Sequence, residues 1–395
     1  MPFRFSMRWQ DADHGPNPLT EAVEARKAGG KPILDLTITN PTLCGLTFPD
    51  WTSLLAQSSV QQYDPHPQGS LKAREAISNY YAERGQTIHA EDLFLTAGTS
   101  EGYSHLFKLL CDAGDEILMP APSYPLLETL ASLEGIQLRF YRDRSSLQAS
   151  LTEKTRALII VQPNNPTGSI LSKDDVEYLI RFAEQNHLAL VVDEVFADYC
   201  LPFDGSTNSP HRSAQGPALA LIHSTQSLVF TLNGLSKTVG LPQLKLAWIH
   251  VDGNPVLKAR AKEHLEWICD AYLSVNTASQ MACPELLRRR SEFQTPIKER
   301  LQANLKILKE IAKANPQIEP LWPQGGWCIP VRCKDVEDDE AFAVTMVKDF
   351  GVLTQPGYFF DFEEENILVL SLLTPPETFR EGLKLLASAT LSQRN

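Results

Sequence analysis

The sequence of 395 residues lacks the features that would direct it to a membrane or to an oxidising compartment. No apolar run approaches the roughly 18 residues that a membrane span needs. The first residues, MPFRFSMRWQDAD, contain no apolar core of a signal peptide. The seven cysteines are odd in number and include no CxxC pair, which argues against a disulfide framework and against a zinc site. We therefore expect a cytoplasmic protein with reduced thiols and no metal.

Positive charge is also scarce. The chain has 36 Lys and Arg against 48 Asp and Glu, a formal net charge of −12. This balance disfavours binding to nucleic acid or to an anionic membrane, because both carry negative charge themselves. The single basic run, Arg288-Arg289-Arg290, lies in a charged helical stretch. With 43% apolar and 21% charged residues, the composition is that of a folded protein of two or three domains.

Short apolar runs alternate with stretches of helical period in the first two thirds of the chain. Several of these runs are apolar nearly throughout, as expected for strands that helices cover on both faces. The alternation predicts an α/β domain with a mainly parallel sheet flanked by helices. The predicted strands are 92–96, 116–120, 137–141, 156–161, 188–193, 227–232 and 244–251, and the predicted helices between or before them are 67–85, 99–111, 123–134 and 172–186.

The pattern changes after about residue 255. Two long stretches of helical period, 255–270 and 283–313, are followed by a smaller α+β unit that ends in a helix over 376–388. We predict three segments. Residues 1–50 form an irregular N-terminal arm that belongs to the small domain, residues 51–282 form the large domain, and residues 283–395 form the small domain, entered by a long bridging helix.

Polar residues follow four of the predicted strands at the point where each strand ends. They are Gly98-Thr99-Ser100, Asn164 to Gly168, Asp193, and Gly234 to Lys237. Because the carboxyl ends of parallel strands meet at one edge of a sheet, we expect these segments to lie together. A glycine that opens a helix suits an anion. Each segment alone is also an ordinary turn, cap or surface lysine, so only their co-location indicates a ligand site.

Together these segments resemble the class I/II aminotransferases, which use pyridoxal 5′-phosphate (PLP) on the fold-type-I scaffold. The resemblance extends from about Asp35 to Ser371 and implies that the large domain binds PLP. It also implies transfer of an amino group between an amino donor and a keto acid or aldehyde, in a homodimer with shared active sites. It is carried by NNPTG at 164–168, DEVF at 193–196 and LSKTVGLPQLK at 235–245, with support from DLTITNPT at 35–42, YDPHPQGSLKAREAI at 63–77, TAGTSEG at 96–102 and PAPSYP at 120–125.

The resemblance implies roles for the residues that contact the cofactor ring. Lys237 holds PLP as a Schiff base and then carries the proton between the substrate and the cofactor. Asp193 pairs with the pyridine nitrogen and keeps the ring electron-withdrawing. Asn165 donates to the 3′ oxygen of the ring, and Tyr124 stacks on its face.

A second group of residues is implied at the phosphate. The amides of Gly98, Thr99 and Ser100 hold it, with Lys245 as counter-charge, and Tyr63 reaches the phosphate of the neighbouring subunit. We hypothesise that Ser236 also supplies a hydroxyl there.

Three departures from the family pattern lie around the cofactor. Phe196 replaces the usual tyrosine that donates to the 3′ oxygen, so we expect a Schiff base with a pKa higher than is usual. Lys245 replaces an arginine, which keeps the charge but loses the bidentate fork. Gly234 replaces a frequent serine, the hydroxyl for which Ser236 is the candidate.

The largest departure is Val369, which stands where the family carries the arginine that binds the substrate α-carboxylate. Either another cation binds the carboxylate or the substrate is not a simple α-amino acid. Arg332 and Arg380 are close in sequence. The aromatic side chains Trp327, Tyr358, Phe359 and Phe360 line the substrate side or pack in the core of the small domain.

Two other functions stay open at this point. A PLP-dependent lyase or decarboxylase would use the same Lys237 and Asp193. A non-catalytic PLP-binding regulatory module is the third reading, although the chain before Asp35 is too short for an added DNA-binding domain. The sequence identifies neither the substrate nor the amino donor.

Overall fold

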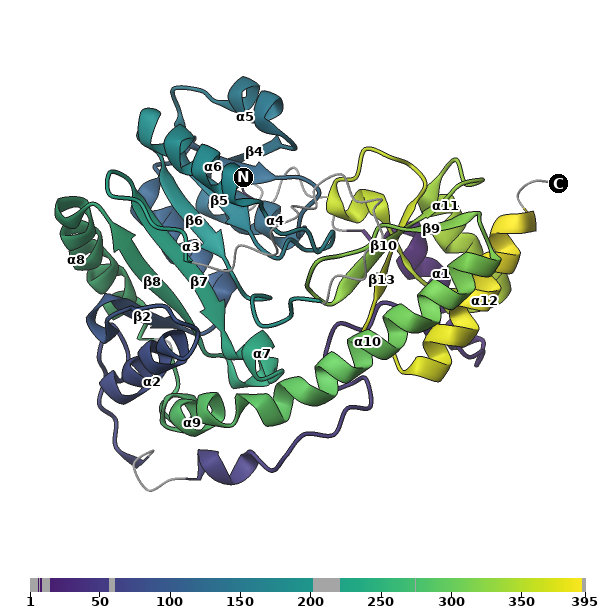
Figure 1. Cartoon of the computed structure of the whole chain (residues 1–395), viewed down its shortest axis with the longest axis horizontal. Helices are drawn as coiled ribbons and strands as arrows, with labels where there is room; N and C mark the ends of the chain where they lie inside the picture. Colours follow the sequence, from purple (N-terminus) through teal and green to yellow (C-terminus); the bar gives the residue numbers. More distant parts are fainter. Residues whose placement is uncertain are drawn as a thin grey trace, which may run out of the picture.

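The computed structural model describes residues 15–56, 61–201, 221–273 and 275–392, together with Ser6 and Arg8. The described chain forms two lobes, and the long helix α10 (Arg290–Ala314) runs from one to the other (Figure 1).

The large lobe is built on one seven-stranded sheet of order β2-β8-β7-β6-β5-β3-β4. All neighbouring strands are parallel except β8, which is antiparallel to both β7 and β2, so the predicted mainly parallel sheet is confirmed. The strands are β2 (Leu93–Thr96), β3 (Glu116–Pro120), β4 (Gln137–Tyr141), β5 (Thr155–Val161), β6 (Ala189–Asp193), β7 (Leu228–Gly234) and β8 (Ala247–Gly253).

Helices cover both faces of this sheet, which explains why its strands are apolar nearly throughout. Successive strand residues pack on opposite sides. Ile117 belongs to the core under one group of helices and Leu118 to the core under the other. The first group is α3 (Thr99–Leu110), α4 (Leu126–Glu134) and α8 (Pro255–Tyr272), and the second is α2 (Leu71–Ala82), α5 (Arg144–Ser150), α6 (Lys173–Gln185) and α9 (Thr277–Arg288).

The small lobe has an antiparallel sheet of order β12-β13-β10-β9. The N-terminal segment packs into it, because Leu19 and Leu36 are buried in the same core as the helices of this lobe. Its further elements are α1 (Pro18–Ala28), β1 (Leu34–Asp35), which pairs with β11 (Val352–Leu353), β9 (Ile318–Pro320), β10 (Cys328–Cys333), α11 (Asp339–Thr345), β12 (Gln355–Pro356), β13 (Ile367–Ser371) and α12 (Pro376–Ser392).

Some of the predicted elements were wrong. The arm is not irregular throughout, because residues 18–28 form helix α1, which Asn17 caps by accepting a hydrogen bond from the amide of Thr20. The single helix expected over 283–313 is two helices that meet at Arg289 and pack on different partners, α9 on α2 and α10 on α12. Helix α5 was not predicted.

The described residues contain no helix long and apolar enough to cross a membrane. Nor do they contain a group of three His, Cys, Asp or Glu side chains that could hold a metal ion.

Candidate active site

A cavity of about 290 Å³ lies at the carboxyl ends of β2, β5, β6 and β7, between the two lobes. Every predicted site residue except Tyr63 lines it, so the segments expected at one sheet edge do meet. The large lobe contributes Gly98, Thr99, Ser100, Tyr103, Tyr124, Leu126, Leu127, Leu130, Val161, Asn165, Asp193, Val195, Phe196, Gly234, Ser236, Lys237, Pro242, Lys245 and Ala247, and the remaining lining is Thr39, Cys328, Gln355 and Phe360.

One end of the cavity suits an anion. Gly98 precedes α3 with a φ of +148°, a conformation that side chains rarely adopt. A Cβ added there would lie 3.2 Å from Nζ of Lys245. The free amides at the start of α3 and the ammonium of Lys245 therefore face one small space, where they provide hydrogen-bond donors and positive charge together.

Asp193, the last residue of β6, is the buried acid of the cavity. Its Oδ1 accepts a hydrogen bond from the amide of Val195, and its Oδ2 accepts one from the hydroxyl of Tyr103, both at 3.0 Å. Removal from water raises the pKa of this carboxyl, while the two donors and the ammonium of Lys237 act in the opposite direction. Sequence reasoning missed Tyr103. It follows Thr99 by one helical turn and so lies on the same face of α3.

Lys237 lies in the short helix α7 (Leu235–Thr238) and is half-buried. Its Nζ is 4.9 Å from the centre of the Trp327 ring and 5.5 Å from that of Phe196. Tyr199 donates a hydrogen bond to its main-chain oxygen at 2.7 Å. Burial lowers the pKa of the Lys237 amine, so more of it is neutral than in a solvated lysine.

The turn that carries Asn165 is fixed by its neighbours and by the small lobe. Asn164 accepts a hydrogen bond from the Thr167 hydroxyl at 2.8 Å and donates one to the main-chain oxygen of Pro122 at 3.3 Å. Gly168 has a φ of +65°, and an added Cβ would lie 2.3 Å from Pro323. Only a glycine lets the small lobe approach this closely.

The small-lobe side of the cavity is apolar. Val369 in β13 is buried and packs with Cys328 and Phe360, two residues of the cavity lining. The arginines considered as replacements lie outside the lining, in exposed ion pairs. Arg332 pairs with Glu319 and Glu364, and Arg380 pairs with Glu310.

The four aromatic residues of the small lobe divide between the two expected locations. Phe360 lines the cavity. Trp327 is buried, and its ring faces the Lys237 amine. Tyr358 and Phe359 pack on each other outside the lining, and the Tyr358 hydroxyl donates to Glu340.

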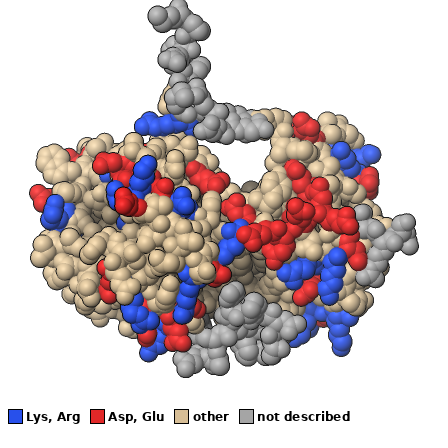
Figure 2. Space-filling view, turned by 90° about the horizontal axis from the view of Figure 1, so that it is seen from above, with Lys and Arg blue, Asp and Glu red and all other residues tan. Residues whose placement is uncertain are grey.

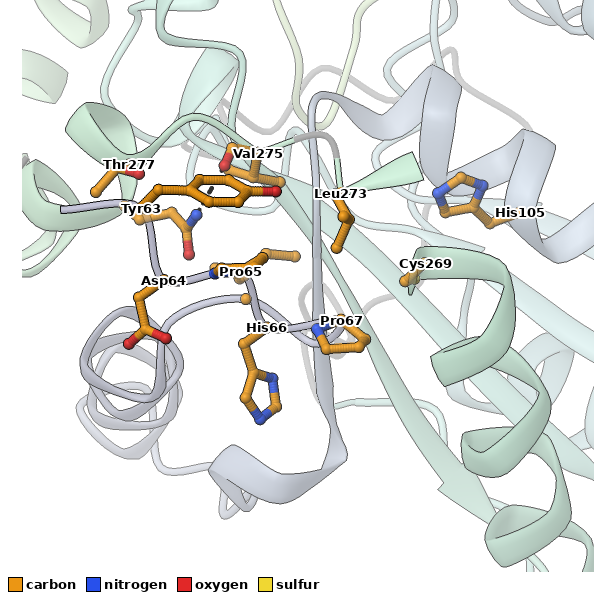
Figure 3. Close-up of a pocket in the computed structure, with 13 residues that line it drawn as sticks. Tyr63, Asp64, Pro65, His66, Pro67, His105, Cys269, Leu273, Val275 and Thr277 are labelled. Carbon is orange, nitrogen blue, oxygen red and sulfur yellow. Dashed lines mark hydrogen bonds between the residues drawn. The ribbon is translucent and has the colours of Figure 1, made fainter. Parts of the chain in front are cut away.

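Tyr63 is the one predicted site residue that does not reach the cavity. Its side chain is 74% exposed and lines a separate, smaller cavity of about 40 Å³ (Figure 3). In that view its ring lies beside Val275 and Thr277, with Leu273 nearby.

The main cavity fits PLP. The amides of residues 98–100 and the Lys245 ammonium form an anion cradle. This cradle, the Lys237 amine and the buried Asp193 carboxylate share one space, and they match the phosphate, the aldehyde and the ring nitrogen of that cofactor. The volume is close to the lower end of the roughly 300–1,000 Å³ typical of small-ligand sites. The fold and the site thus define a PLP-dependent enzyme of fold type I.

Comparison with known proteins specifies the class further. The family model for aminotransferase class I and II matches residues 31–384, and the chain belongs to this family. It is 30% identical to the glutamate-pyruvate aminotransferase AlaA of Escherichia coli K12, over 87% of this chain and 86% of that protein. Human tyrosine aminotransferase is 26% identical over 95% of this chain and 85% of that protein.

Solved structures share the fold. An aminotransferase from Escherichia coli superposes with a TM-score of 0.82 at 25% identity and 99% coverage of both chains. The alanine aminotransferase of Pyrococcus furiosus superposes with a TM-score of 0.85 at 20% identity, covering 98% of this chain and 100% of that one. The protein is a PLP-dependent aminotransferase, which moves an amino group between a donor and an acceptor.

Proposed function

We propose that Lys237 is the residue through which this aminotransferase moves the amino group between an amino donor and a keto acid or aldehyde. The observation that carries the proposal is the position of its half-buried amine in the same cavity as the buried carboxylate of Asp193. Burial lowers the pKa of Lys237, so its amine is neutral more often than that of a solvated lysine, and a neutral amine can attach to a carbonyl carbon or accept a proton.

PLP, when bound, supplies a carbonyl carbon that accepts amines and a ring that takes up the electrons released when a C–H bond breaks. With PLP bound, Nζ of Lys237 would hold the aldehyde carbon of the cofactor and, once released, would serve as the base that accepts the proton of the substrate carbon. Asp193 would hold the charge of the ring nitrogen, Tyr124 would pack on the ring, and Asn165 would donate to the ring oxygen.

The remaining predicted residues hold the phosphate. The amides of Gly98, Thr99 and Ser100 donate to its oxygens, and Lys245 neutralises its charge. Ser236, which also lines the cavity, supplies a hydroxyl that Gly234 does not have.

The test is the visible absorbance of the purified protein with PLP, followed by addition of amino donors. We expect a band from bound PLP that a donor bleaches and an acceptor restores. Lys237→Ala should lose the band while keeping its melting temperature within a few degrees, and Lys173→Ala, at an exposed position on α6, should behave as wild type. Full activity of Lys237→Ala would contradict the proposal.

We also propose that the protein is a homodimer in which Tyr63 reaches the phosphate of the partner subunit. The exposure of Tyr63, and of the neighbouring Tyr272 and Leu273 on α8 and its end, supports this arrangement. Light scattering of the purified protein measures its mass in solution, which should be that of two chains.

A mixed dimer of Lys237→Ala and Tyr63→Ala subunits tests the sharing of sites. It should contain one site with both residues intact and so regain tight PLP binding in half of its sites. PLP affinity no better than that of the Tyr63→Ala homodimer would contradict a shared site.

Two further proposals concern organisation and location. We propose the division into an arm over 1–50, a large domain over 51–282 and a small domain over 283–395, which limited proteolysis between the lobes would test. We propose a cytoplasmic location, which the seven free cysteines support, and fractionation of cells would test it.

A further inference from the structure

We infer that the substrates of this enzyme carry no carboxylate on the reacting carbon. They are apolar amines on the donor side and the corresponding aldehydes or ketones on the acceptor side. The inference rests on the proposed role of Lys237 and names the substrate class of that same cavity.

The first argument is the distribution of positive charge. Among the described residues that line the cavity, the cations are Lys237 and Lys245. Lys245 belongs to the anion cradle beside Gly98, and Lys237 is the amine that reacts. A carboxylate placed between them and the small lobe would leave water without gaining a counter-charge from the described residues, which is strongly unfavourable in an enclosed site.

The second argument is the chemistry of the opposite wall. Thr39 and Gln355 are uncharged there, and Cys328 and Phe360 are apolar. Val369 lies directly behind this wall, packed on Cys328 and Phe360 and paired in the sheet with Gln355 and Pro330. The wall therefore suits an aliphatic or aromatic substituent, with at most a neutral hydrogen-bonding group.

Two other arginines near the small lobe, Arg300 in α10 and Arg142 after β4 of the large lobe, are engaged elsewhere. The guanidinium of Arg300 donates to the main-chain oxygens of Cys44 and Leu373 at 2.9 and 2.8 Å. Arg142 pairs with Glu363 at 3.0 Å and donates to the main-chain oxygen of Asp361. Neither belongs to the cavity lining.

The third argument is the negative charge beside the lining. Glu128 follows the lining residue Leu127, and Asp361 follows the lining residue Phe360. The two carboxyls are close enough that the charge of Asp361 adds to burial in raising the pKa of Glu128. Acidic side chains also gather on the small lobe beside the hollow between the lobes (Figure 2). Arg142 offsets part of this charge, but Glu128, Asp361 and Glu363 outnumber it. The remaining field attracts an ammonium ion and repels a carboxylate.

The reaction of this substrate class balances without a further reagent. The donor loses its amino group and two electrons, and its carbon gains a carbonyl oxygen from water. The acceptor gains the amino group and two electrons, and its carbonyl oxygen leaves as water. Bound PLP would supply the group that stores the amino group and the two electrons between the two halves.

A pair of compounds that differ only in the carboxylate tests the inference. Stopped-flow absorbance of the PLP-loaded protein measures how fast 2-phenylethylamine and L-phenylalanine bleach the bound-cofactor band. Calorimetry of the same protein measures binding of two unreactive analogues, 3-phenylpropanamide and 3-phenylpropanoate. We expect the amine to react at least 10-fold faster at equal concentration, and the neutral amide to bind at least 10-fold tighter.

Two variants at one position provide the control. Val369→Arg places a cation behind the apolar wall and should reverse both preferences by 10-fold or more. Val369→Leu changes the volume without the charge and should leave both preferences as in wild type. If Val369→Arg does not fold, the wild-type comparison decides alone.

The measurements distinguish a failure of this inference from a failure of the proposed function. If L-phenylalanine reacts faster than the amine in wild type, and the carboxylate analogue binds tighter, the inference is overturned while the proposed function stands. If no amine and no amino acid, including glutamate and alanine, alters the band, the proposed function fails and the inference fails with it.

Discussion

The hydroxyl of Tyr103 donates a hydrogen bond to Oδ2 of Asp193 over 3.0 Å, inside the cavity that also holds Lys237. This bond joins helix α3, which begins at the anion cradle, to the carboxyl end of β6. Under the proposed role of Asp193 at the cofactor ring, Tyr103 is a positioning residue, because it acts on that carboxylate and not on the reacting atoms.

Tyr103→Phe removes this donor without changing the shape of the side chain. Because the hydrogen bond favours the charged carboxylate, its loss should raise the pKa of Asp193 further. We expect PLP to bind about 5–10-fold more weakly, as a bond worth roughly 1 kcal/mol implies. Fluorescence titration with PLP from pH 5 to 9 measures the effect, which should be largest at the acid end.

The matched control is Tyr141→Phe, which removes a buried hydroxyl that donates to the main-chain oxygen of Ile159 at 2.8 Å. Tyr141 lies outside the lining of the cavity. Tyr141→Phe should lower the melting temperature about as much as Tyr103→Phe does and leave PLP affinity unchanged. Equal losses of PLP affinity in the two variants would mean that Tyr103 acts only through stability.

Gly98→Ala should weaken the hold on the phosphate. The new Cβ would lie 3.2 Å from Nζ of Lys245. The alanine would also have to keep a φ of +148°, and this backbone strain costs about 1–3 kcal/mol. PLP affinity should fall 10-fold or more, whereas affinity for pyridoxal, which has no phosphate, should change little. Gly114→Ala is the control. It keeps a φ of +91°, and no described atom lies within 4 Å of the new Cβ, so it should lower the stability of the protein without changing PLP affinity.

Glu194 should make stability depend on pH. It is buried, its Oε2 has no hydrogen-bond partner within the described part of the chain, and burial raises its pKa to about 7. The pKa of this carboxyl is 4.5 in the unfolded chain and about 7 in the folded protein. Between these two pH values the folded protein holds a proton that the unfolded chain has released. The contribution of Glu194 to stability is therefore complete below pH 4.5 and lost as the pH rises through about 7.

The variant Glu194→Gln cannot lose this proton. Its melting temperature should match that of wild type at pH 4.5 and exceed it at pH 8, by the equivalent of about 3 kcal/mol or less. Thermal scans at fixed PLP concentration give the difference. Glu365→Gln, at an exposed position, should show none. A difference that does not vary with pH would refute the assignment.

Phe196→Tyr should restore a donor that this chain lacks. Phe196 lines the cavity and packs edge-on against Trp327, with ring centres 5.4 Å apart. A hydroxyl there can donate to the ring oxygen of PLP and stabilise its charged form. The pH at which the visible band of the loaded protein changes should fall by about one unit. Phe359→Tyr, outside the lining, should leave that pH where it is in wild type.

The sequence pattern was informative where local chemistry and tertiary structure agree. All seven strands of the large sheet were predicted within three residues at their starts, because a buried parallel strand is recognisable as a short apolar run between turns. The residues at the ends of those strands could be placed together for the same reason. Asp193 and Lys237, 44 residues apart, needed only the rule that parallel strands end at one edge.

What could not be predicted depends on contacts distant in sequence. Helix α1 has little apolar pattern, because Leu19 and Ala22 are its buried residues, so the cap at Asn17 is its clearest local signal. Thr39 and Gln355 line the cavity because the segment before Thr39 is bonded to β13, where Ser371 donates from its amide to the oxygen of Leu36. No local pattern contains that information. Tyr103 was missed although its helical spacing from Thr99 was visible.

The pairing of β1 with β11 joins Leu34 to Val352, and the cavity takes residues from Thr39 to Phe360. A chain emerging from the ribosome can build the large sheet soon after its last strand, β8, is complete. The proposed PLP contacts from Gly98 to Lys245 all belong to this sheet and its loops, so they can assemble at that stage. The opposite wall of the cavity is complete only with Phe360, more than a hundred residues later. The order of synthesis thus separates capture of the cofactor from completion of the substrate side, and the chain gains its activity only when its last third has folded.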